Sequence, residues 1–427
     1  METLTVPDPA LGEYGHRLPA PLPGCKGVLF TIVRTGWEMK PRLAFLDLAT
    51  GKWRELLEDA SDARYIPTGH IVFLRQGTLM AAPFDPGRGR LTGTPAPAVA
   101  GIVHALNTGS SINSCGNCQL AVSRGGALAY GPGGTIPDRK DELVWVDREG
   151  REKAASAQLR HYIYPRLSPD GRRVVFTTGG TAPHLWVHDM ERDVSIRVVS
   201  EGTSHAPVWE PSGETLFFGW HINAADRNIY KLSFEGGSRP KAVTLGAVEQ
   251  LPGSVSPDGR ALVYLDQDRD QYDIFIRDLE SGTVTPFAAD KDHEEWYPEF
   301  SPDGRWLAYC SDMEDRPEVY VRPYPGPGMP VKVSTAGGIE PCWARSGTSL
   351  FFRSSDGAQM WKVEVRAGTA FSVGRPTLLF EKRGLKNTIP VRSHDISLDD
   401  QRFLMIRMGD TPARPVTELV LVQNWTA

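Results

Sequence analysis

Three stretches of the chain combine acidic, basic and aromatic residues within ten positions, which are residue types that acid–base catalysis uses. They are FSPDGRWLAY at residues 300–309, LSPDGRRVVF at 167–176 and VSPDGRALVY at 255–264. A catalytic group is built once in a chain, whereas a stretch written three times is typical of a structural repeat. Proline, aspartate and glycine in this order predict a tight turn. We therefore expect these aspartates to be turn residues.

Cys115 and Cys118 form a C-x-x-C motif in SCGNCQ, which could supply two thiolates to zinc. A structural zinc site needs four ligands, and Cys25, Cys310 and Cys342 are isolated in the sequence. An odd number of cysteines spread over a long chain also does not resemble a disulfide framework. We expect a local disulfide or two loop thiols.

His184 and His188 lie four residues apart in HLWVH, on a segment that we expect to be a strand. Both side chains would then point to the same face of the sheet. Two imidazoles can begin a metal site, but the sequence identifies no third ligand. We expect these histidines to lie at the surface or between sheets.

Asp266, Asp268 and Asp270 are spaced like the start of a calcium loop, because hard cations prefer clustered carboxylate oxygens. The glycine and the distal glutamate of an EF-hand loop are missing. We therefore expect this segment to form the turn of a β-hairpin. These three aspartates are the calcium candidate, and we expect no other metal and no cofactor.

The turn motif belongs to a longer repeat with a spacing of 42 to 53 residues. Each unit contains short apolar runs rich in Val, Phe, Tyr and Trp, bounded by Gly, Pro or Asp, which predicts strands rather than helices. We predict an all-β protein, a β-propeller of four-stranded antiparallel blades with nine repeat units. The turn markers are Asp170, Ser212, Asp258, Asp303, Ser346 and Asp399, with weaker copies at Gly24, Thr68 and Arg124. The aromatic residues expected to pack between neighbouring sheets are Phe176, Phe217, Tyr264, Tyr309 and Phe351.

The last repeat ends at its third strand, in ELVLVQNWTA, and needs a fourth strand from upstream. TLTV at residues 3–6 would close a nine-bladed ring, whereas REKAA at 151–155 would close a six-bladed ring. Propellers typically have four to eight blades, which favours the smaller ring, although three remaining blades would expose strand edges. We expect three propeller-type blades in residues 1–156, part of an incomplete or larger ring, and a six-bladed propeller in residues 157–427. One larger ring is the alternative.

The overall charge disfavours nucleic acid as a partner, because a net charge of −5 and a pI near 6.1 provide no basic field for phosphates. Residues 266–318 hold 16 Asp or Glu against 5 Lys or Arg, which predicts an acidic, solvated rim. No stretch reaches 18 apolar residues, and the N-terminal segment has no basic region followed by an apolar run. We therefore expect neither a membrane span nor an export signal in this chain.

Several segments resemble the TolB-like, WD-repeat-like propeller region found C-terminal to many bacterial serine/threonine protein kinases. They are SDARYIPTGHIVFLRQGTLMAAPFDP, LVWVDREGRE, YPRLSPDGRRVVF, RPEVYVRPYPGPG, VSTAGGIEPCWARSG and HDISLDDQRFLMI. The resemblance covers nearly the whole chain and implies a sensor or protein-interaction module with a link to a kinase or signalling partner. Its counterparts often lie outside the membrane. The sequence contains no kinase motif, so we do not expect kinase activity. It also lacks the G-x-S-x-G nucleophile elbow of peptidases that carry a propeller, so we do not expect peptidase activity.

The expected function is non-catalytic binding of a protein, a peptide or a small molecule over the central channel. In a propeller the innermost strands line this channel, while the loops at its mouth are free to vary. The alternatives are that these side chains only fill the channel, or that the protein is a lactonase- or lyase-type enzyme with a channel metal or histidine. The residues expected at the channel mouth are Tyr162, Tyr164, His205, Gln250, Trp296, Tyr297, Glu340, His394 and Asp395.

Overall fold

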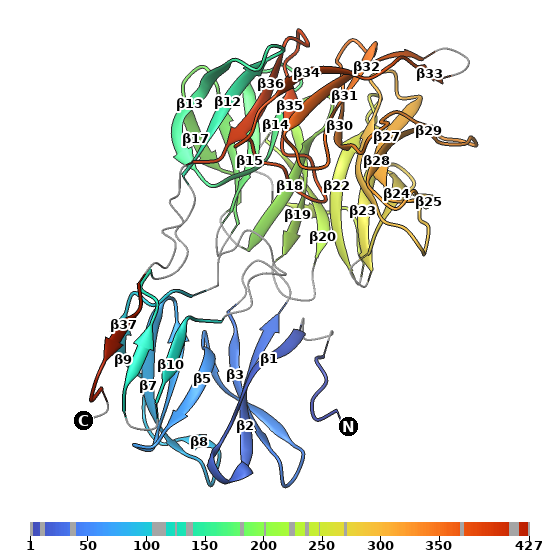
Figure 1. Cartoon of the computed structure of the whole chain (residues 1–427). Coiled ribbons are helices and arrows are strands. Elements are labelled where there is room, and N and C mark those ends of the chain that lie inside the picture. The colour runs from blue at the N-terminus through green and yellow to red at the C-terminus, as the bar shows by residue number, and fades with distance from the viewer. Residues whose placement is uncertain are drawn as a thin grey trace. The chain divides into compact units, whose positions relative to one another are not determined.

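Antiparallel sheets make up nearly all of the regular structure in the computed structural model. It describes residues 3–8, 13–34, 40–104, 117–123, 126–133, 140–179, 183–199, 202–221, 227–234, 239–246, 248–268, 271–367, 371–409 and 418–425. These residues form the strands β1 to β37 and one short 3-10 turn, η2 (Pro23–Cys25), with no α-helix among them. None of them forms a helix long and apolar enough to cross a membrane. The strands are grouped in nine mostly four-stranded sheets (Figure 1), which confirms the prediction of an all-β chain with nine blade-like units.

The chain divides into two compact units. Unit 1 comprises Met1–Asp138, Gly180–Ala182 and Thr411–Ala427, and unit 2 comprises Arg139–Gly179 and Pro183–Asp410. In sequence, therefore, unit 2 is inserted into unit 1. The division after residue 138 differs from the one that we expected after residue 156.

Unit 1 contains three sheets. The first is β1 (Glu13–Pro21), β2 (Gly27–Arg34), β3 (Arg42–Asp47) and β4 (Trp53–Glu58). The second is β5 (Ser61–Ile66), β6 (His70–Arg75), β7 (Thr78–Asp85) and β8 (Arg90–Leu91), and β9 (Ala96–Ala100) also pairs with β7. The third is β10 (Leu120–Val122), β11 (Leu128–Tyr130) and β37 (Val420–Val422).

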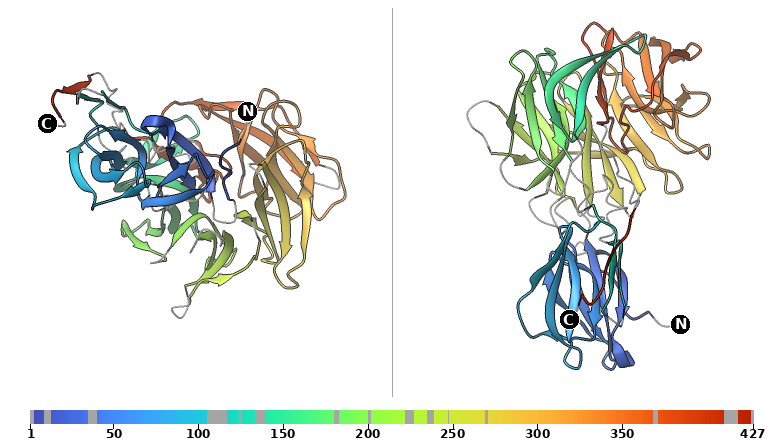
Figure 2. Two further views of the ribbon diagram at one scale, coloured as in Figure 1. Left: turned by 90° about the horizontal axis from the view of Figure 1, so that it is seen from below. Right: turned by 60° about the vertical axis from the view of Figure 1, so that its left-hand side comes forward.

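Five of the six sheets of unit 2 use strands that are consecutive in the chain. The first two are β14 (Tyr162–Leu167), β15 (Arg173–Thr178), β16 (Leu185–Asp189) and β17 (Val194–Arg197), then β18 (Thr203–Trp209), β19 (Thr215–His221), β20 (Asn228–Ser233) and β21 (Lys241–Ala242). The next two are β22 (Glu249–Val255), β23 (Ala261–Asp268), β24 (Gln271–Asp278) and β25 (Val284–Ala288), then β26 (Glu295–Phe300), β27 (Trp306–Ser311), β28 (Glu318–Pro323) and β29 (Val331–Lys332). The fifth is β30 (Ile339–Trp343), β31 (Ser349–Arg353), β32 (Gln359–Ala367) and β33 (Phe371–Val373), with β34 (Thr377–Glu381) also paired to β32. Neighbouring first strands contact one another in chain order, from β14 through β18, β22 and β26 to β30, as in adjacent propeller blades. Figure 2 shows the strands of unit 2 following one another in colour from green through yellow to orange.

The sixth sheet of unit 2 combines strands from two distant parts of the chain. It runs β13 (Glu152–Arg160), β12 (Asp141–Asp147), β36 (Arg402–Arg407) and β35 (Asp395–Ile396). β12 pairs with β36 from Glu142↔Arg407 to Asp147↔Arg402. The segment REKAA therefore lies in the outer strand β13, and a second upstream strand, β12, takes the third position of this sheet.

The segment that we expected in this third position, within ELVLVQNWTA, instead forms β37 in unit 1. There it pairs with β11 over three residues. The other expected closing segment, TLTV at residues 3–6, is described but lies in no strand. The physical reason is packing. β12 pairs with the edge of β36 and places Val144 and Val146 in one buried apolar cluster with Phe403 and Met405.

The repeated S-P-D-G stretches are turns, as predicted. Ser168 Oγ donates a hydrogen bond to Asp170 Oδ1 at 2.5 Å, and the same carboxylate oxygen accepts from the Arg172 amide at 3.0 Å. Gly171 has a φ of 69°, in the left-handed region that glycine tolerates. The same side-chain bonds recur in four later turns, at Ser256 and Asp258, Ser301 and Asp303, Ser354 and Asp356, and Ser397 and Asp399.

The aromatic residues that follow these turns form the core between sheets. All five that we expected there are at most 2% exposed. The rings of Phe351 on β31 and Phe403 on β36 meet edge to face, with their centroids 5.1 Å apart. The prediction of aromatic packing between neighbouring sheets is therefore confirmed at this junction.

Candidate functional site

Four of the first strands in unit 2 carry the same bulge. In each, the strand register shifts and a residue directly before a proline has a φ of 50° to 55°. Such a conformation is uncommon for a residue with a side chain, and a bulge changes the direction in which that side chain points. The bulged residues are Tyr164, Ala206, Tyr297 and Glu340. Three of these were expected at the channel mouth.

Residues 386–394, which we name the hub segment, connect β34 to β35 and reach the first strands of several sheets. Lys386 Nζ donates to the Tyr162 carbonyl at 2.8 Å. The Tyr297 hydroxyl donates to the Thr388 carbonyl at 2.7 Å. Val391 belongs to an apolar cluster with residues of β14, β18, β22 and β26. The hub segment therefore fills space that we expected to lie open at the channel.

Glu340 is the centre of a buried hydrogen-bond network. Its carboxylate accepts from the Ser393 amide at 2.9 Å and from the Thr388 amide at 3.1 Å. His394 Nδ1 lies 3.2 Å and Arg353 Nη1 3.3 Å from the other carboxylate oxygen. Burial opposes ionisation of Glu340, but the His394 hydrogen bond and the Arg353 charge lower its pKa to about 2. Burial lowers the pKa of His394 to about 4, so the imidazole is neutral at pH 7.

Asp395 lies in a second buried group of charges. Its carboxylate accepts from the Leu167 amide at 2.8 Å and lies 3.4 Å from Arg392 Nη2. Arg392 also pairs with Glu299 at 2.7 Å, and Arg166 donates to the Arg392 carbonyl at 2.8 Å. Every charge in this group therefore faces an opposite charge or a hydrogen-bond partner, as buried ions require.

All nine residues that we expected at the channel mouth are at most 8% exposed. Glu340, His394 and Asp395 belong to the two networks above. Gln250 donates to Asp266 Oδ2 at 3.2 Å. These nine side chains are therefore buried, and they form no open surface of their own.

His205 lies in a different group, together with two residues that the sequence did not single out. His205 is on β18, His221 is the last residue of β19, and Glu249 is the first residue of β22. β18 and β19 pair in the register Thr203↔His221 and His205↔Gly219, which places both imidazoles at one end of the hairpin. Only the strand register could have shown this, because no short sequence motif contains all three residues.

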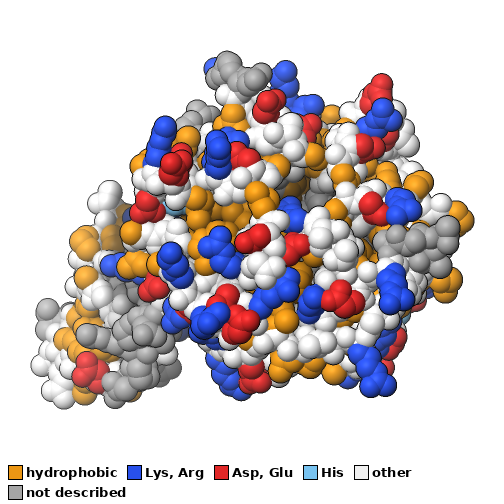
Figure 3. Space-filling model, turned by 90° about the horizontal axis from the view of Figure 1, so that it is seen from above, with side chains coloured by type: hydrophobic (Ala, Val, Ile, Leu, Met, Phe, Trp, Pro, Cys, Tyr) orange, Lys and Arg blue, Asp and Glu red, His pale blue; other side chains and the backbone are white. Residues whose placement is uncertain are grey.

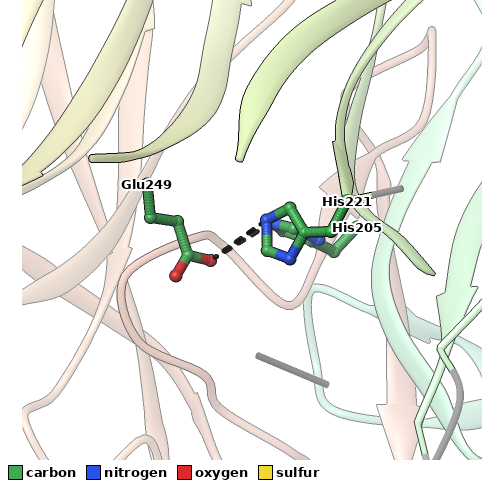
Figure 4. Close-up of side chains that lie close together, drawn as sticks. All are labelled: His205, His221 and Glu249. Atoms are coloured by element: carbon green, nitrogen blue, oxygen red, sulfur yellow. Dashed lines mark ion pairs between the residues drawn. The ribbon is translucent and has the colours of Figure 1, made fainter. Parts of the chain in front are cut away.

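One potential ligand atom from each of these three residues lies within 4.8 Å of the others. Glu249 Oε1 is 3.3 Å from His205 Nε2 and 3.9 Å from His221 Nε2, and Figure 4 shows the carboxylate facing the imidazoles. The two histidine rings meet edge to face with centroids 4.5 Å apart. Among the described residues this is the only group of at least three His, Cys, Asp or Glu side chains with such spacing.

Burial and mutual charge set the protonation of this group. Burial and the neighbouring His205 lower the pKa of His221 to about 3, so His221 is neutral at pH 7. Burial opposes ionisation of Glu249, but the adjacent His205 and His221 imidazoles lower its pKa to about 2. A carboxylate beside two imidazoles is a donor set that zinc and related ions accept.

Gly219 provides the space that the His205 ring occupies. A Cβ atom at position 219 would lie 2.7 Å from His205 Nε2. This separation is shorter than real Cβ contacts, so any other residue would displace the imidazole.

His184 and His188 have separate partners. His188 Nδ1 lies 3.1 Å from Ser195 Oγ, and its Nε2 lies 3.3 Å from Asp193. His184 Nδ1 lies 2.9 Å from Arg197 Nη2. The two histidines therefore serve as local contacts in the first sheet of unit 2.

Cys118 is a free thiol whose Sγ donates to Asp62 Oδ2 at 3.1 Å. Burial and the Asp62 charge raise the pKa of this thiol well above its usual range. Cys115, the other half of the motif, lies outside the described residues.

The calcium candidate falls on a hairpin. β23 and β24 pair as far as Asp266↔Asp273 and Asp268↔Gln271. Asp270 lies outside the described residues. Asp266 belongs to no described group with metal-ligand spacing.

An open cavity of about 380 Å³ lies elsewhere in unit 2, between its second and third sheets. It contains none of the nine residues expected at the channel mouth. Its charged lining residues are Glu210, Lys231, Arg239, Lys241, Arg260 and Glu280. Figure 3 shows Lys and Arg side chains intermixed with Asp and Glu over one face of the molecule, without a large region of one sign.

Known proteins similar to this chain share its fold and part of its sequence. No family model matches the chain. A TolB homologue of Chlorobium chlorochromatii is 31% identical over 108 residues, which are 24% of this chain and 23% of that protein. A TolB homologue of Chlorobium luteolum is 33% identical over 126 residues, which are 28% of this chain and 27% of that protein. The chain therefore spans about a quarter of the length of these curated relatives.

A solved structure from Agrobacterium tumefaciens, described as a TolB, matches with a TM-score of 0.53 at 19% identity. The match covers 64% of this chain and 100% of that chain. These matches and the blade-like sheets show that the fold of the chain is similar to a TolB-like β-propeller region.

Proposed function

We propose that unit 2 closes into a six-bladed propeller that acts as a non-catalytic module and binds a protein or peptide partner. The observation that carries this proposal is the burial and mutual hydrogen bonding of the polar side chains around the hub segment. A buried network in which most polar groups are hydrogen-bonded makes a site rigid, whereas a catalytic acid or base must reach its substrate. A rigid support with variable loops suits partner binding.

Ring closure is supported by the contacts of the sixth sheet of unit 2. Ile396 and Phe403 of that sheet share an apolar cluster with Cys342 and Phe351 of the fifth sheet. Arg345 lies in the turn that follows β30 of the fifth sheet, and its amide donates to Asp400 Oδ1 of the sixth sheet at 2.6 Å. The sixth sheet is therefore packed against the fifth, and its strands β35 and β36 also contact β14 of the first sheet.

The binding surface that we propose surrounds the exposed part of the hub segment. Asn387 and Ile389 are exposed there, and the Ile389 residue is 61% exposed although Pro390 and Val391 are buried. A large apolar side chain held on a rigid support is a suitable anchor for a partner chain. Sensor or scaffold activity and the link to a kinase, which the sequence resemblance implies, stay predictions.

Peptide display on the immobilised, purified chain would test this function. We expect selected peptides to bind in calorimetric titrations and to bind Ile389→Asp at least about tenfold more weakly, because a charge would replace the apolar anchor. Met329→Asp is the control, since Met329 is 84% exposed and lies outside the hub segment. Failure to enrich any peptide, or equal weakening by both substitutions, would contradict the proposal.

A second candidate function, a lactonase- or lyase-type enzyme, is favoured by the group of His205, His221 and Glu249. Two imidazoles and a carboxylate could hold an ion that activates water. Turnover of lactone or uronate substrates by the purified chain, lost in His205→Ala, would favour this candidate over the binding module.

A further inference from the structure

We propose that His205, His221 and Glu249 bind one divalent ion of the zinc class and that this ion links two neighbouring sheets of unit 2. Both histidines come from the sheet of β18 to β21, and the carboxylate comes from the first strand of the next sheet. The inference goes beyond the proposed function, because the ion can bind whether or not the hub segment has a partner.

The distances between the three groups fit a tetrahedral ion. Ligands at about 2.0 to 2.1 Å from zinc lie roughly 3.3 to 3.4 Å apart along a tetrahedral edge. Glu249 Oε1 is already 3.3 Å from His205 Nε2 and 3.9 Å from His221 Nε2. The ligand atoms of the two histidines lie within 4.8 Å of each other, so side-chain movements of about an ångström would complete the arrangement.

The nitrogen atoms of the two histidines are buried and lack hydrogen-bond partners. His205 and His221 are 2% and 6% exposed. Within the described part of the chain, both ring nitrogens of His205 and the Nε2 of His221 lack a hydrogen-bond partner. Buried polar atoms without partners are rare in folded proteins, and each needs an explanation. A bound ion would supply the missing partner for one nitrogen of each ring.

The donor set selects the kind of ion. Imidazole nitrogens suit zinc, cobalt and nickel, whereas calcium and magnesium prefer oxygen ligands. The site holds a single carboxylate, and the positive charge of Arg227 acts on both Glu249 and His221. Calcium or magnesium, which bind mainly through negatively charged oxygens, should therefore bind weakly at this site. The affinity for an ion has to come from coordination by the two imidazole nitrogens.

Three protein ligands leave one coordination position for water or for a ligand atom, which is the arrangement of open zinc sites.

Because the ligands come from two sheets, the ion should also act as a crosslink. A ligand that binds only the folded state stabilises it in proportion to the logarithm of its concentration. We therefore expect the unfolding temperature to rise with zinc concentration.

The test is metal binding by the full chain, prepared without a histidine tag and stripped with a chelator. Titration with Zn²⁺ should show one tight site per chain, and Co²⁺ should give the visible spectrum of a tetrahedral complex. Ca²⁺ and Mg²⁺ should neither bind tightly nor raise the unfolding temperature. We expect His221→Ala and Glu249→Gln each to weaken Zn²⁺ binding by about 100-fold or more and to remove the zinc-dependent rise in unfolding temperature.

Two variants act as controls. His188→Gln removes another buried histidine and should keep full zinc affinity. Gly219→Ala keeps all three ligands but places a Cβ atom 2.7 Å from His205 Nε2, so it should weaken binding by displacing the ring. Equal zinc affinity in the wild type and in the His221 and Glu249 variants would overturn the proposal, as would no zinc uptake by the wild type.

Anomalous diffraction from crystals of the zinc-loaded chain decides the question even if the ligand variants do not fold. A peak between the three side chains would support the site. A peak only at other positions would overturn it.

Discussion

The carboxylate of Glu340 lies 3.2 Å from Nδ1 of His394, a residue 54 positions further along the chain. Glu340 occupies a bulge of β30, and His394 ends the hub segment. Both side chains are fully buried. Their contact, with the amide bonds from Ser393 and Thr388, fixes the hub segment against the first strand of the fifth sheet of unit 2.

Replacing Glu340 with glutamine should destabilise the protein by on the order of 2 to 4 kcal/mol. An amide has one acceptor oxygen, so several of the buried donors that now face the carboxylate would lose their partner. Urea unfolding at pH 7 would measure the loss. Because the folded-state pKa of Glu340 is lowered to about 2, its stabilising contribution is present above its ordinary value of 4.5 and is lost as the pH falls toward 2.

The matched control for this change is Glu280→Gln, at an exposed glutamate of unit 2. It should change the free energy of unfolding by less than about 0.5 kcal/mol. A Glu340→Gln variant as stable as this control would show that the network contributes little to the fold.

The contribution of Glu295 to the free energy of unfolding should have the opposite pH dependence. It is buried, and burial together with the charge of Asp273 raises its pKa from 4.5 to about 8. The folded protein therefore keeps this proton at pH values where the unfolded chain has lost it. The stabilising contribution is present below pH 4.5 and is lost as the pH rises through 8.

We therefore expect Glu295→Gln, which cannot ionise, to be more stable than the wild type at pH 8 by on the order of 1 to 3 kcal/mol. The difference should shrink toward zero at pH 5, where the wild-type carboxyl is protonated in the folded state. Chemical unfolding of both proteins across this pH range measures the trend. A difference that stays constant with pH would refute the assigned protonation.

Gly304→Ala tests the role of the repeated turn. Gly304 has a φ of 70°, and a Cβ atom there would lie 3.3 Å from Cδ of Pro257 in the preceding turn. We expect a loss of about 1 kcal/mol in the free energy of unfolding, since alanine is strained at this φ. Gly374→Ala is the control, because the nearest atom to its Cβ is 3.5 Å away and its φ is not positive. Equal losses in both variants would argue against a conformational requirement at Gly304.

Two shortened chains test the sixth sheet of unit 2. Residues 139–410 contain all four strands of that sheet, whereas residues 157–410 lack β12 and most of β13. We expect the longer piece to unfold in one cooperative thermal transition, and the shorter piece to aggregate or unfold without cooperativity, because β36 would be an uncovered apolar edge. Circular dichroism and light scattering would distinguish these outcomes. Cooperative unfolding of the shorter piece would mean that β12 is dispensable.

The repeated turns and the apolar runs were sufficient to predict the sheets, because both depend on local sequence. The strand that completes the sixth sheet was not predictable in this way. The sequence around β12 reads ELVWV from Glu142, and that around β37 reads ELVLV from Glu418. These near-identical runs have the same strand propensity, so the choice between them depends on contacts with distant residues such as Phe403.

The candidate site was predictable only in part, for a related reason. His205 was found because it enters a first strand, but His221 and Glu249 join it only through the β18–β19 register and the contact with the next sheet. The burial of the expected channel residues was not predictable, because the hub segment has no counterpart in the other repeats. Its insertion between β34 and β35 replaces solvent with protein at those positions.

The pairing of β11 with β37 has a mechanical consequence. The two strands meet over only three residue pairs, Leu128↔Val422, Ala129↔Leu421 and Tyr130↔Val420, and the whole of unit 2 lies between them in sequence. A pull between β11 and β37 is therefore carried by this short ladder. Until it separates, the six sheets of unit 2 form a loop that carries no load, and any partner held there is shielded from the pull.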